Sequence, residues 1–132
     1  MFQIKLDKLN TAIEFSVEGL VQVDEMKQFV AELRRSAVTM TGSELKIFAD
    51  LRKFRPASPD VVEVVRDVQE FAKTMGVRRM ATVLESEVLA LHMSRLARET
   101  GADRFIRRFT DEQEAREWLA GSESLRKSRR LP

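Results

Sequence analysis

Apolar and polar side chains alternate in two short runs at the start of the chain. The apolar members of these runs are Phe2, Ile4, Leu6, Ile13, Phe15 and Val17. A period of two is typical of a β-strand with one buried face. Residues 7–10 between the runs have turn-forming ends, so the pattern predicts an N-terminal β-hairpin that Gly19 closes.

After the hairpin, the apolar residues recur with the period of an α-helix. They share one face of the predicted helix and are Met26, Phe29, Val30, Leu33 and Ala37. Asp24 precedes them, and an aspartate there can cap a helix because its carboxylate accepts from the free amides of the first turn. We therefore expect a helix that begins after Asp24.

The rest of the chain repeats a strand followed by a helix. Mostly apolar runs predict strands at residues 45–51, 80–84 and 105–109. Helical stripes follow these strands at residues 59–75, 87–100 and 111–120. Because strand–helix–strand units give parallel pairing, the order β-β-α-β-α-β-α-β-α predicts an α/β fold with a mostly parallel five-stranded sheet. The N-terminal strand, which is joined through a hairpin, should be antiparallel.

Polar residues with capping side chains stand before the later helices. Ser58 is followed by a proline, which suits the first helical position, and Ser86 precedes the next helix. Thr110 or Asp111 caps the last helix. As a cap, Ser58 should stabilise the chain by about 1 kcal/mol relative to alanine. Ser58 is also a candidate phosphorylation site, because a helix N-terminus favours the added negative charge.

The charge of the chain is concentrated at its C-terminal end. We expect one domain over residues 1–121, followed by a basic and disordered tail over residues 122–132. The whole chain carries a net charge of +2 and the tail alone carries +3, so the remainder carries −1. A short basic end of this kind is typical of a solvated segment. The charge therefore predicts no nucleic-acid partner.

Cysteine is absent from the sequence, and His92 is its single histidine. Disulfides, thiol nucleophiles and thiolate metal sites are therefore excluded, and a transition-metal site is not expected. The glycines are scattered, so they form no phosphate-binding loop. We expect no catalytic residues, no metal ligands and no cofactor, and hence a protein that is not an enzyme.

The sequence also bears on where the protein resides. No apolar run approaches the roughly 18 residues that a membrane-spanning helix needs. The first residues lack the pattern of a signal peptide, and the absence of cysteine fits a reducing compartment. We therefore expect a cytoplasmic protein without a membrane span.

The predicted fold indicates where a ligand should bind. In open parallel sheets, ligands lie beyond the carboxyl ends of the strands, where helix N-termini converge. Asp50 and Arg52 alternate with Leu51 at such a strand end, so we expect them to form a salt bridge. Phe54 follows in a charged loop, where it either covers an apolar cavity or completes the core.

The helix predicted at residues 87–100 has more apolar surface than one buried face needs. Leu89, Met93, Leu96 and Ala97 make one face, and Val88 and Leu91 extend it around the helix. Such a helix is deeply buried, pairs with a second subunit or lines a cavity. The candidate ligand- or partner-binding residues are Asp50, Arg52, Phe54, Ser58, Glu85, Ser86 and Met93.

Several of these segments together resemble the SpoIIAA-like family. They are the hairpin, the strand ending at residues 48–52, the strand at residues 80–84, and the closing segment with Trp118 and Leu119. The resemblance covers residues 2–120 and implies a STAS-type fold similar to CRAL-TRIO lipid-carrier domains. It also implies a non-enzymatic carrier or sensor of a small apolar molecule.

The sequence departs from one branch of the STAS class. Anti-anti-sigma factors of that class carry an Asp-Ser-Ser-Gly-type phosphorylation motif after the equivalent strand, whereas residues 50–53 here read Asp-Leu-Arg-Lys. The leading hypothesis is therefore a binding module for an apolar, lipid-like ligand. The alternative is a protein–protein docking domain of the anti-anti-sigma kind, and a homodimer is compatible with either.

Overall fold

The computed structural model describes residues 1–40 and 44–121. Within it, β1 (Phe2–Asp7) and β2 (Ala12–Val17) form the predicted antiparallel hairpin. The chain then continues into a short strand, β3 (Gly19–Val21), so Gly19 begins a further strand rather than closing the hairpin. The expectation of a disordered tail at residues 122–132 lies outside the described residues.

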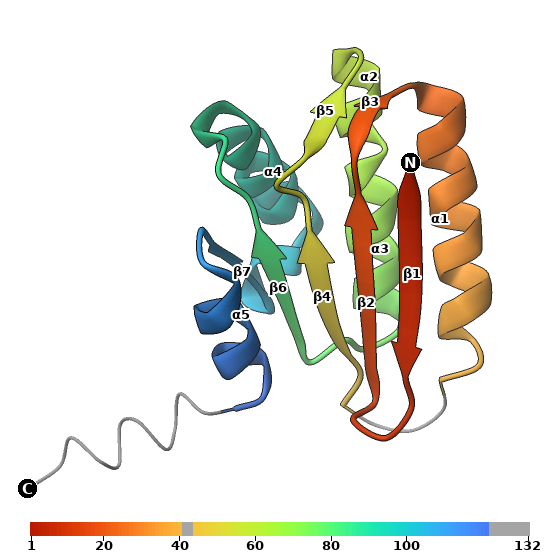
Figure 1. Cartoon of the computed structure of the whole chain (residues 1–132), viewed down its shortest axis with the longest axis vertical. Helices are drawn as coiled ribbons and strands as arrows, with labels where there is room; N and C mark the ends of the chain where they lie inside the picture. The colour runs from red at the N-terminus through yellow and green to blue at the C-terminus, as the bar shows by residue number, and fades with distance from the viewer. Residues whose placement is uncertain (41–43, 122–132) are drawn as a thin grey trace, which may run out of the picture.

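The main sheet has five strands in the order β1-β2-β4-β6-β7 (Figure 1). Its later strands are β4 (Lys46–Asp50), β6 (Arg79–Val83) and β7 (Ile106–Phe109). The pairs β2–β4, β4–β6 and β6–β7 are parallel, and the β1–β2 pair is antiparallel. The predicted α/β fold with a mostly parallel five-stranded sheet is therefore confirmed.

Helices cover both faces of this sheet (Figure 1). On one face pack α1 (Val23–Ala37), α3 (Val65–Thr74) and α4 (Glu87–Thr100). On the other face packs α5 (Glu112–Leu119), which contacts β4, β6 and β7. A turn of 3-10 helix, η1 (Ala102–Arg104), connects α4 to β7. No helix in the described part of the chain is long and apolar enough to cross a membrane.

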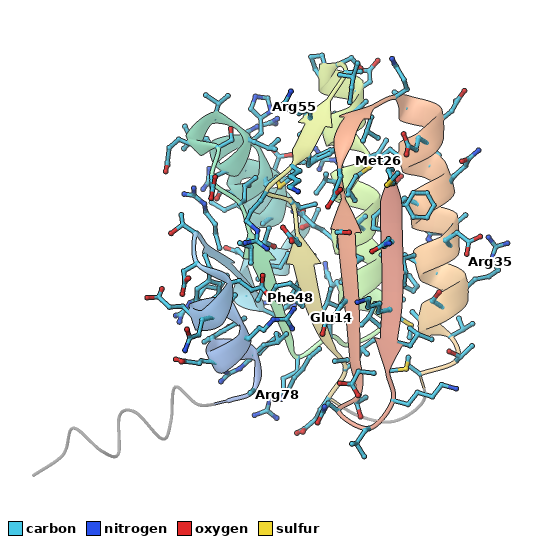
Figure 2. All side chains as sticks on the ribbon, viewed as in Figure 1. Glu14, Met26, Arg35, Phe48, Arg55 and Arg78 are labelled. Carbon is cyan, nitrogen blue, oxygen red and sulfur yellow. The ribbon has the colours of Figure 1, made fainter. Side chains whose placement is uncertain are left out.

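Each face of the sheet has its own apolar core, because successive side chains of a strand point to opposite faces. The larger core lies under α1, α3 and α4 and includes Phe15 and Phe29, whose ring centroids are 4.8 Å apart. The smaller core lies under α5 and includes Phe48 and Trp118. Figure 2 shows Phe48 on the α5 side of the sheet.

A second, two-stranded sheet stands above the carboxyl ends of the main strands (Figure 1). In it, β5 (Phe54–Pro56) pairs in parallel with β3, a pairing that the sequence does not predict. Phe54 is buried in the larger core. Phe54 therefore completes the core, which is one of the two roles that the sequence analysis gave it.

Some predicted helix boundaries are wrong. Gln22 occupies the cap position of α1, so Asp24 lies inside the first turn, where its charge still favours the helix. The helix predicted at residues 59–75 is divided at Val64 into α2 (Pro59–Glu63) and α3. Ser58 stands at the cap position of α2, but its side chain makes no capping hydrogen bond.

The two later caps are confirmed. The Ser86 hydroxyl accepts from the amide of Leu89 at 3.2 Å at the start of α4. The Asp111 carboxylate accepts from the amide of Glu114 at 3.0 Å at the start of α5. Asp111 rather than Thr110 is therefore the cap of the last helix.

Candidate functional site

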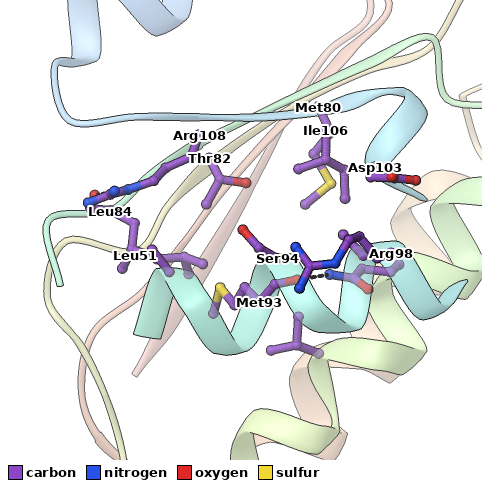
Figure 3. Close-up of a pocket in the computed structure, with 14 residues that line it drawn as sticks. Leu51, Met80, Thr82, Leu84, Met93, Ser94, Arg98, Asp103, Ile106 and Arg108 are labelled. Carbon is purple, nitrogen blue, oxygen red and sulfur yellow. Dashed lines mark hydrogen bonds between the residues drawn. The ribbon is translucent and has the colours of Figure 1, made fainter. Parts of the chain in front are cut away.

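A pocket of about 280 Å³ lies between α4 and the sheet, and we call it the α4 pocket (Figure 3). Its walls come from β6, β7, α3, α4 and η1, and from the residues that directly follow β4 and β6. The apolar side chains that line it are Leu51, Val65, Met80, Leu84, Ala90, Met93, Ala97 and Ile106. All of these except Ile106 are at most 9% exposed, so the pocket has an apolar and buried interior.

The register of the sheet explains which side chains reach the pocket. Met80 and Thr82 alternate along β6 and point to the α4 side, whereas Ala81 belongs to the core under α5. Met80 pairs with Ile106 of β7, which brings the two apolar side chains together in the same wall. From the helix side, Ala90 and Ala97 contribute only methyl groups, and their small size leaves space above the sheet.

The pocket opens to solvent at a polar rim, and its volume is larger than that of the voids inside a packed core. Interiors pack at the density of organic crystals and contain few voids larger than a water molecule. Since a water molecule takes about 30 Å³ of the liquid, the pocket corresponds to the volume of about nine waters. Apolar walls around such a space forgo the dispersion contacts that a filled core would make.

The polar groups at the back of the pocket are satisfied within the protein. The amide nitrogen of Gln69 donates to the carbonyl of Met93 at 3.4 Å, and its oxygen accepts from the hydroxyl of Thr100 at 3.1 Å. Gln69 is only 3% exposed, so these bonds fix α3 against α4 in a dry environment. This pair therefore has a structural role.

Arg108 closes one end of the pocket. Its guanidinium donates to the backbone carbonyls of Leu84 at 2.9 Å and Glu85 at 3.2 Å. It also forms a salt bridge with Glu87 at 3.2 Å in the first turn of α4. These bonds tie β7 to the start of α4 and hold the charge of Arg108 outside the apolar interior.

A second hollow, of about 650 Å³ and more open to solvent, lies beyond the carboxyl ends of the strands. This is the place that the sequence predicts for a site. Of the predicted site residues, Arg52, Phe54, Ser58 and Ser86 line it. Val88 and His92 of α4 complete its wall.

Asp50 and Arg52 form the predicted salt bridge, at 2.8 Å, but Arg52 also bonds Glu112 of α5 at 2.7 Å. The hydrogen bond from Arg52 lowers the pKa of Asp50. Hydrogen bonds from Arg116 and Arg52 lower the pKa of Glu112 in the same way. The chain of ion pairs continues from Arg116 to Glu14 at 3.1 Å, so it fastens α5 to the sheet.

The remaining predicted site residues lie apart from one another. The side chain of Glu85 is exposed, and its backbone carbonyl accepts from Arg108. Met93 lines the α4 pocket and is the one predicted site residue that does so. The predicted site residues therefore divide between the open hollow and the α4 pocket, except Asp50 and Glu85, which line neither.

The sequence analysis missed all the polar residues of the α4 pocket, which are Gln69, Thr82, Ser94, Arg98, Asp103 and Arg108. Thr82 is a polar residue within an apolar strand, and this was the signal that could have found it. Ser94 and Arg98 directly follow Met93 and Ala97 and lie one helical turn from each other, and they had no comparable signal. Of the three alternatives for the helix at residues 87–100, deep burial of the whole helix is wrong, because Val88 and Leu91 are 70% and 71% exposed.

Comparison with known proteins identifies relatives of this fold. A family model described as SpoIIAA-like matches residues 12–120. A crystal structure of an uncharacterised DUF3478-family protein with a SpoIIAA-like fold, from Shewanella loihica PV-4, is similar with a TM-score of 0.66. The two are 14% identical, and the match covers 89% of this chain and 93% of that chain. This likeness shows the fold alone, and no curated protein matches the sequence.

Proposed function

The chain belongs to the SpoIIAA-like family, and from this premise we propose that it is a non-enzymatic binding module for a small apolar, lipid-like molecule. The ligand occupies the α4 pocket, and the protein acts as its carrier or sensor. The observation that supports this proposal most directly is an apolar space of about 280 Å³ among side chains that solvent hardly reaches.

The apolar walls set the strength of binding that we expect. Burial of a methylene group is worth about 0.8 kcal/mol, so an eight-carbon chain gains about 6 kcal/mol before the cost of ordering it. The gain alone corresponds to a dissociation constant of about 40 µM, and the ordering cost raises it toward about 1 mM. An apolar cavity of only about 150 Å³ in another protein is enough to bind benzene.

Native mass spectrometry and thermal unfolding of the full chain test this proposal together. Gently purified protein should retain a small apolar molecule, and protein stripped of it should be stabilised by 1-octanol. A ligand at 100 times its dissociation constant raises the free energy of unfolding by about 2.7 kcal/mol. Ethylene glycol, which has almost no apolar surface, serves as the control. The absence of both a retained molecule and a 1-octanol shift would overturn the proposal.

Self-association is a second candidate function of α4, and a separate observation favours it. Val88 and Leu91 lie one turn apart on the outer face of α4, and each is more than two-thirds exposed. Neighbouring exposed apolar side chains are typical of a contact between proteins. Here we propose a second copy of this chain as the occupant.

Sedimentation velocity at micromolar concentration tests the second candidate. The wild type should sediment as a dimer and Leu91→Glu as a monomer, because the new charge is unfavourable in an apolar interface. Gln28→Glu makes the same charge change on the exposed side of α1 and should remain dimeric. A monomeric wild type would refute this candidate and leave the ligand proposal unaffected.

A further inference from the structure

We infer that the ligand of the α4 pocket carries a carboxylate, which Thr82, Ser94 and Arg98 bind at the rim of the pocket. This inference rests on the proposed function and names the chemical class of its ligand. It follows from three polar groups that line the apolar space and have no hydrogen-bond partner among the described residues.

Thr82 is the most informative of the three. The buried polar side chains in the described part of the chain are Gln69, Thr82 and Thr100, and Gln69 and Thr100 bond each other. Thr82 is 7% exposed, and its hydroxyl has no protein partner. Within the described ranges, every fully buried side-chain nitrogen or oxygen has a partner, so the Thr82 hydroxyl is not fully buried, and it lines the pocket. The hydroxyl therefore opens into an otherwise apolar space and is free to bond a ligand oxygen there.

Ser94 and Arg98 face Thr82 from the other side of the pocket. They are one helical turn apart on α4, and helical side chains lean toward the N-terminus, so the guanidinium of Arg98 lies beside Ser94 (Figure 3). Both are exposed at the rim, where they meet solvent as well as the pocket. The Thr82 hydroxyl inside the pocket and the Ser94 hydroxyl and Arg98 guanidinium at its rim thus line one apolar space.

The neighbouring arginines, unlike Arg98, already have carboxylate partners among the described residues. Arg66 and Arg95 both form salt bridges with Glu99, at 2.8 and 3.3 Å, and Arg108 is held by Glu87. Arg98 is close enough to the end of α4 for its charge to favour the helix, and this is the competing structural explanation. That explanation predicts no preference for one ligand head group over another.

Asp103 lies on the same rim and carries the opposite charge. It makes no ion pair with Arg98 within 4 Å, and it repels an incoming anion. Arg98 therefore has to outweigh Asp103 for a carboxylate to bind. This arrangement predicts that removal of the Asp103 charge strengthens the binding of an anion, whereas removal of the Arg98 charge weakens it.

The proportions of the pocket suit a short amphiphile. Its volume corresponds to about nine non-hydrogen atoms at about 30 Å³ each. Octanoate has about this size, with an apolar tail for the interior and a carboxylate for the three donors. A guanidinium and two hydroxyl donors favour a carboxylate over an alcohol, and the Arg98 charge opposes an ammonium group.

Calorimetric titration of the stripped full chain with octanoate, 1-octanol and octylammonium at neutral pH tests the inference. Octanoate should bind about tenfold more tightly than 1-octanol, and octylammonium should bind more weakly than either. Arg98→Gln and Thr82→Val should each weaken octanoate by about tenfold and leave 1-octanol within about twofold. Asp103→Asn should strengthen octanoate, and Arg95→Gln, which removes a cation from α4 outside the pocket, should change nothing.

The outcomes separate this inference from the proposed function. If 1-octanol binds and octanoate binds no more tightly, the carboxylate inference is overturned and the apolar ligand stands. If neither alcohol nor acid binds, both fail. Arg98 would have a role in helix stability instead if Arg98→Gln lowered the affinity for all three ligands equally. The same would follow if Arg95→Gln lowered the octanoate affinity as much as Arg98→Gln does. Arg98→Lys keeps the charge and should retain most of the octanoate preference.

Discussion

Filling the α4 pocket with protein should stabilise the fold and abolish binding at the same time. Ala97→Leu adds three carbon atoms on the pocket side of α4, and leucine keeps the helix propensity high. At about 30 Å³ per carbon, the new side chain takes up about 90 Å³ of the 280 Å³ available. An eight-carbon ligand then no longer fits.

The gain in stability follows from the same three carbons. Their burial contributes about 2.4 kcal/mol, and ordering the leucine side chain costs about 0.5–1 kcal/mol, which leaves about 1.5 kcal/mol. For a domain of this size, such a gain raises the melting temperature by about 6 °C. Chemical denaturation measures the gain in the free energy of unfolding. Calorimetry with 1-octanol measures the loss of affinity, which should be at least tenfold.

Ala120→Leu makes the same substitution at an exposed position at the end of α5 and provides the control. It should change the free energy of unfolding by less than about 0.5 kcal/mol, and it should leave the affinity for 1-octanol unchanged. A destabilised Ala97→Leu chain would mean that the space is already filled and that the leucine overpacks it. Unchanged 1-octanol affinity in that variant would place the ligand elsewhere.

Further predictions concern the caps and the ion pairs. Ser86→Ala should destabilise the chain by about 1 kcal/mol in urea unfolding, because it removes a capping hydrogen bond, whereas Ser58→Ala should cost less than about 0.5 kcal/mol. The lowered pKa of Asp50 makes a contribution to stability that is present above its unfolded pKa of about 3.9. That contribution is lost as the pH falls through the folded pKa, so urea unfolding of Asp50→Asn should depend less steeply on pH below about 4; equal slopes would contradict this.

The fold was predictable because its elements have clear periods. The alternation in β1 and β2 and the helical stripe of α1 each require one buried face, and that face fixes where the element packs. β5 was not predictable, because its three residues include Arg55 and Pro56 and it is a strand only through its pairing with β3. Short strands depend on their partners more than on their own sequence.

The site was predictable only in part, for a related reason. The rule for open sheets led to the hollow beyond the strand ends, which Arg52 and Phe54 do line. It did not reveal that Glu112, sixty residues away, engages Arg52, because no periodicity gives the position of α5 on the sheet. Nor can a sequence show that Met93 and its neighbours leave a space unfilled, since that depends on the separation of α4 from the sheet.

The two faces of β6 show why the space lies under α4 and not under α5. On the α5 side, Ala81 and Val83 are small, but Trp118 and Phe48 fill the gap above them. Their neighbours Met80 and Thr82 face a helix that offers mainly methyl groups at Ala90 and Ala97. Large side chains thus complement small ones on the α5 face of the strand. On the α4 face this complementarity is missing, and the hydroxyl of Thr82, which bonds no other described residue, lines the space. Packing alone would have favoured a larger residue at position 97 and valine at position 82, so the departure from good packing is concentrated where a ligand is proposed to bind.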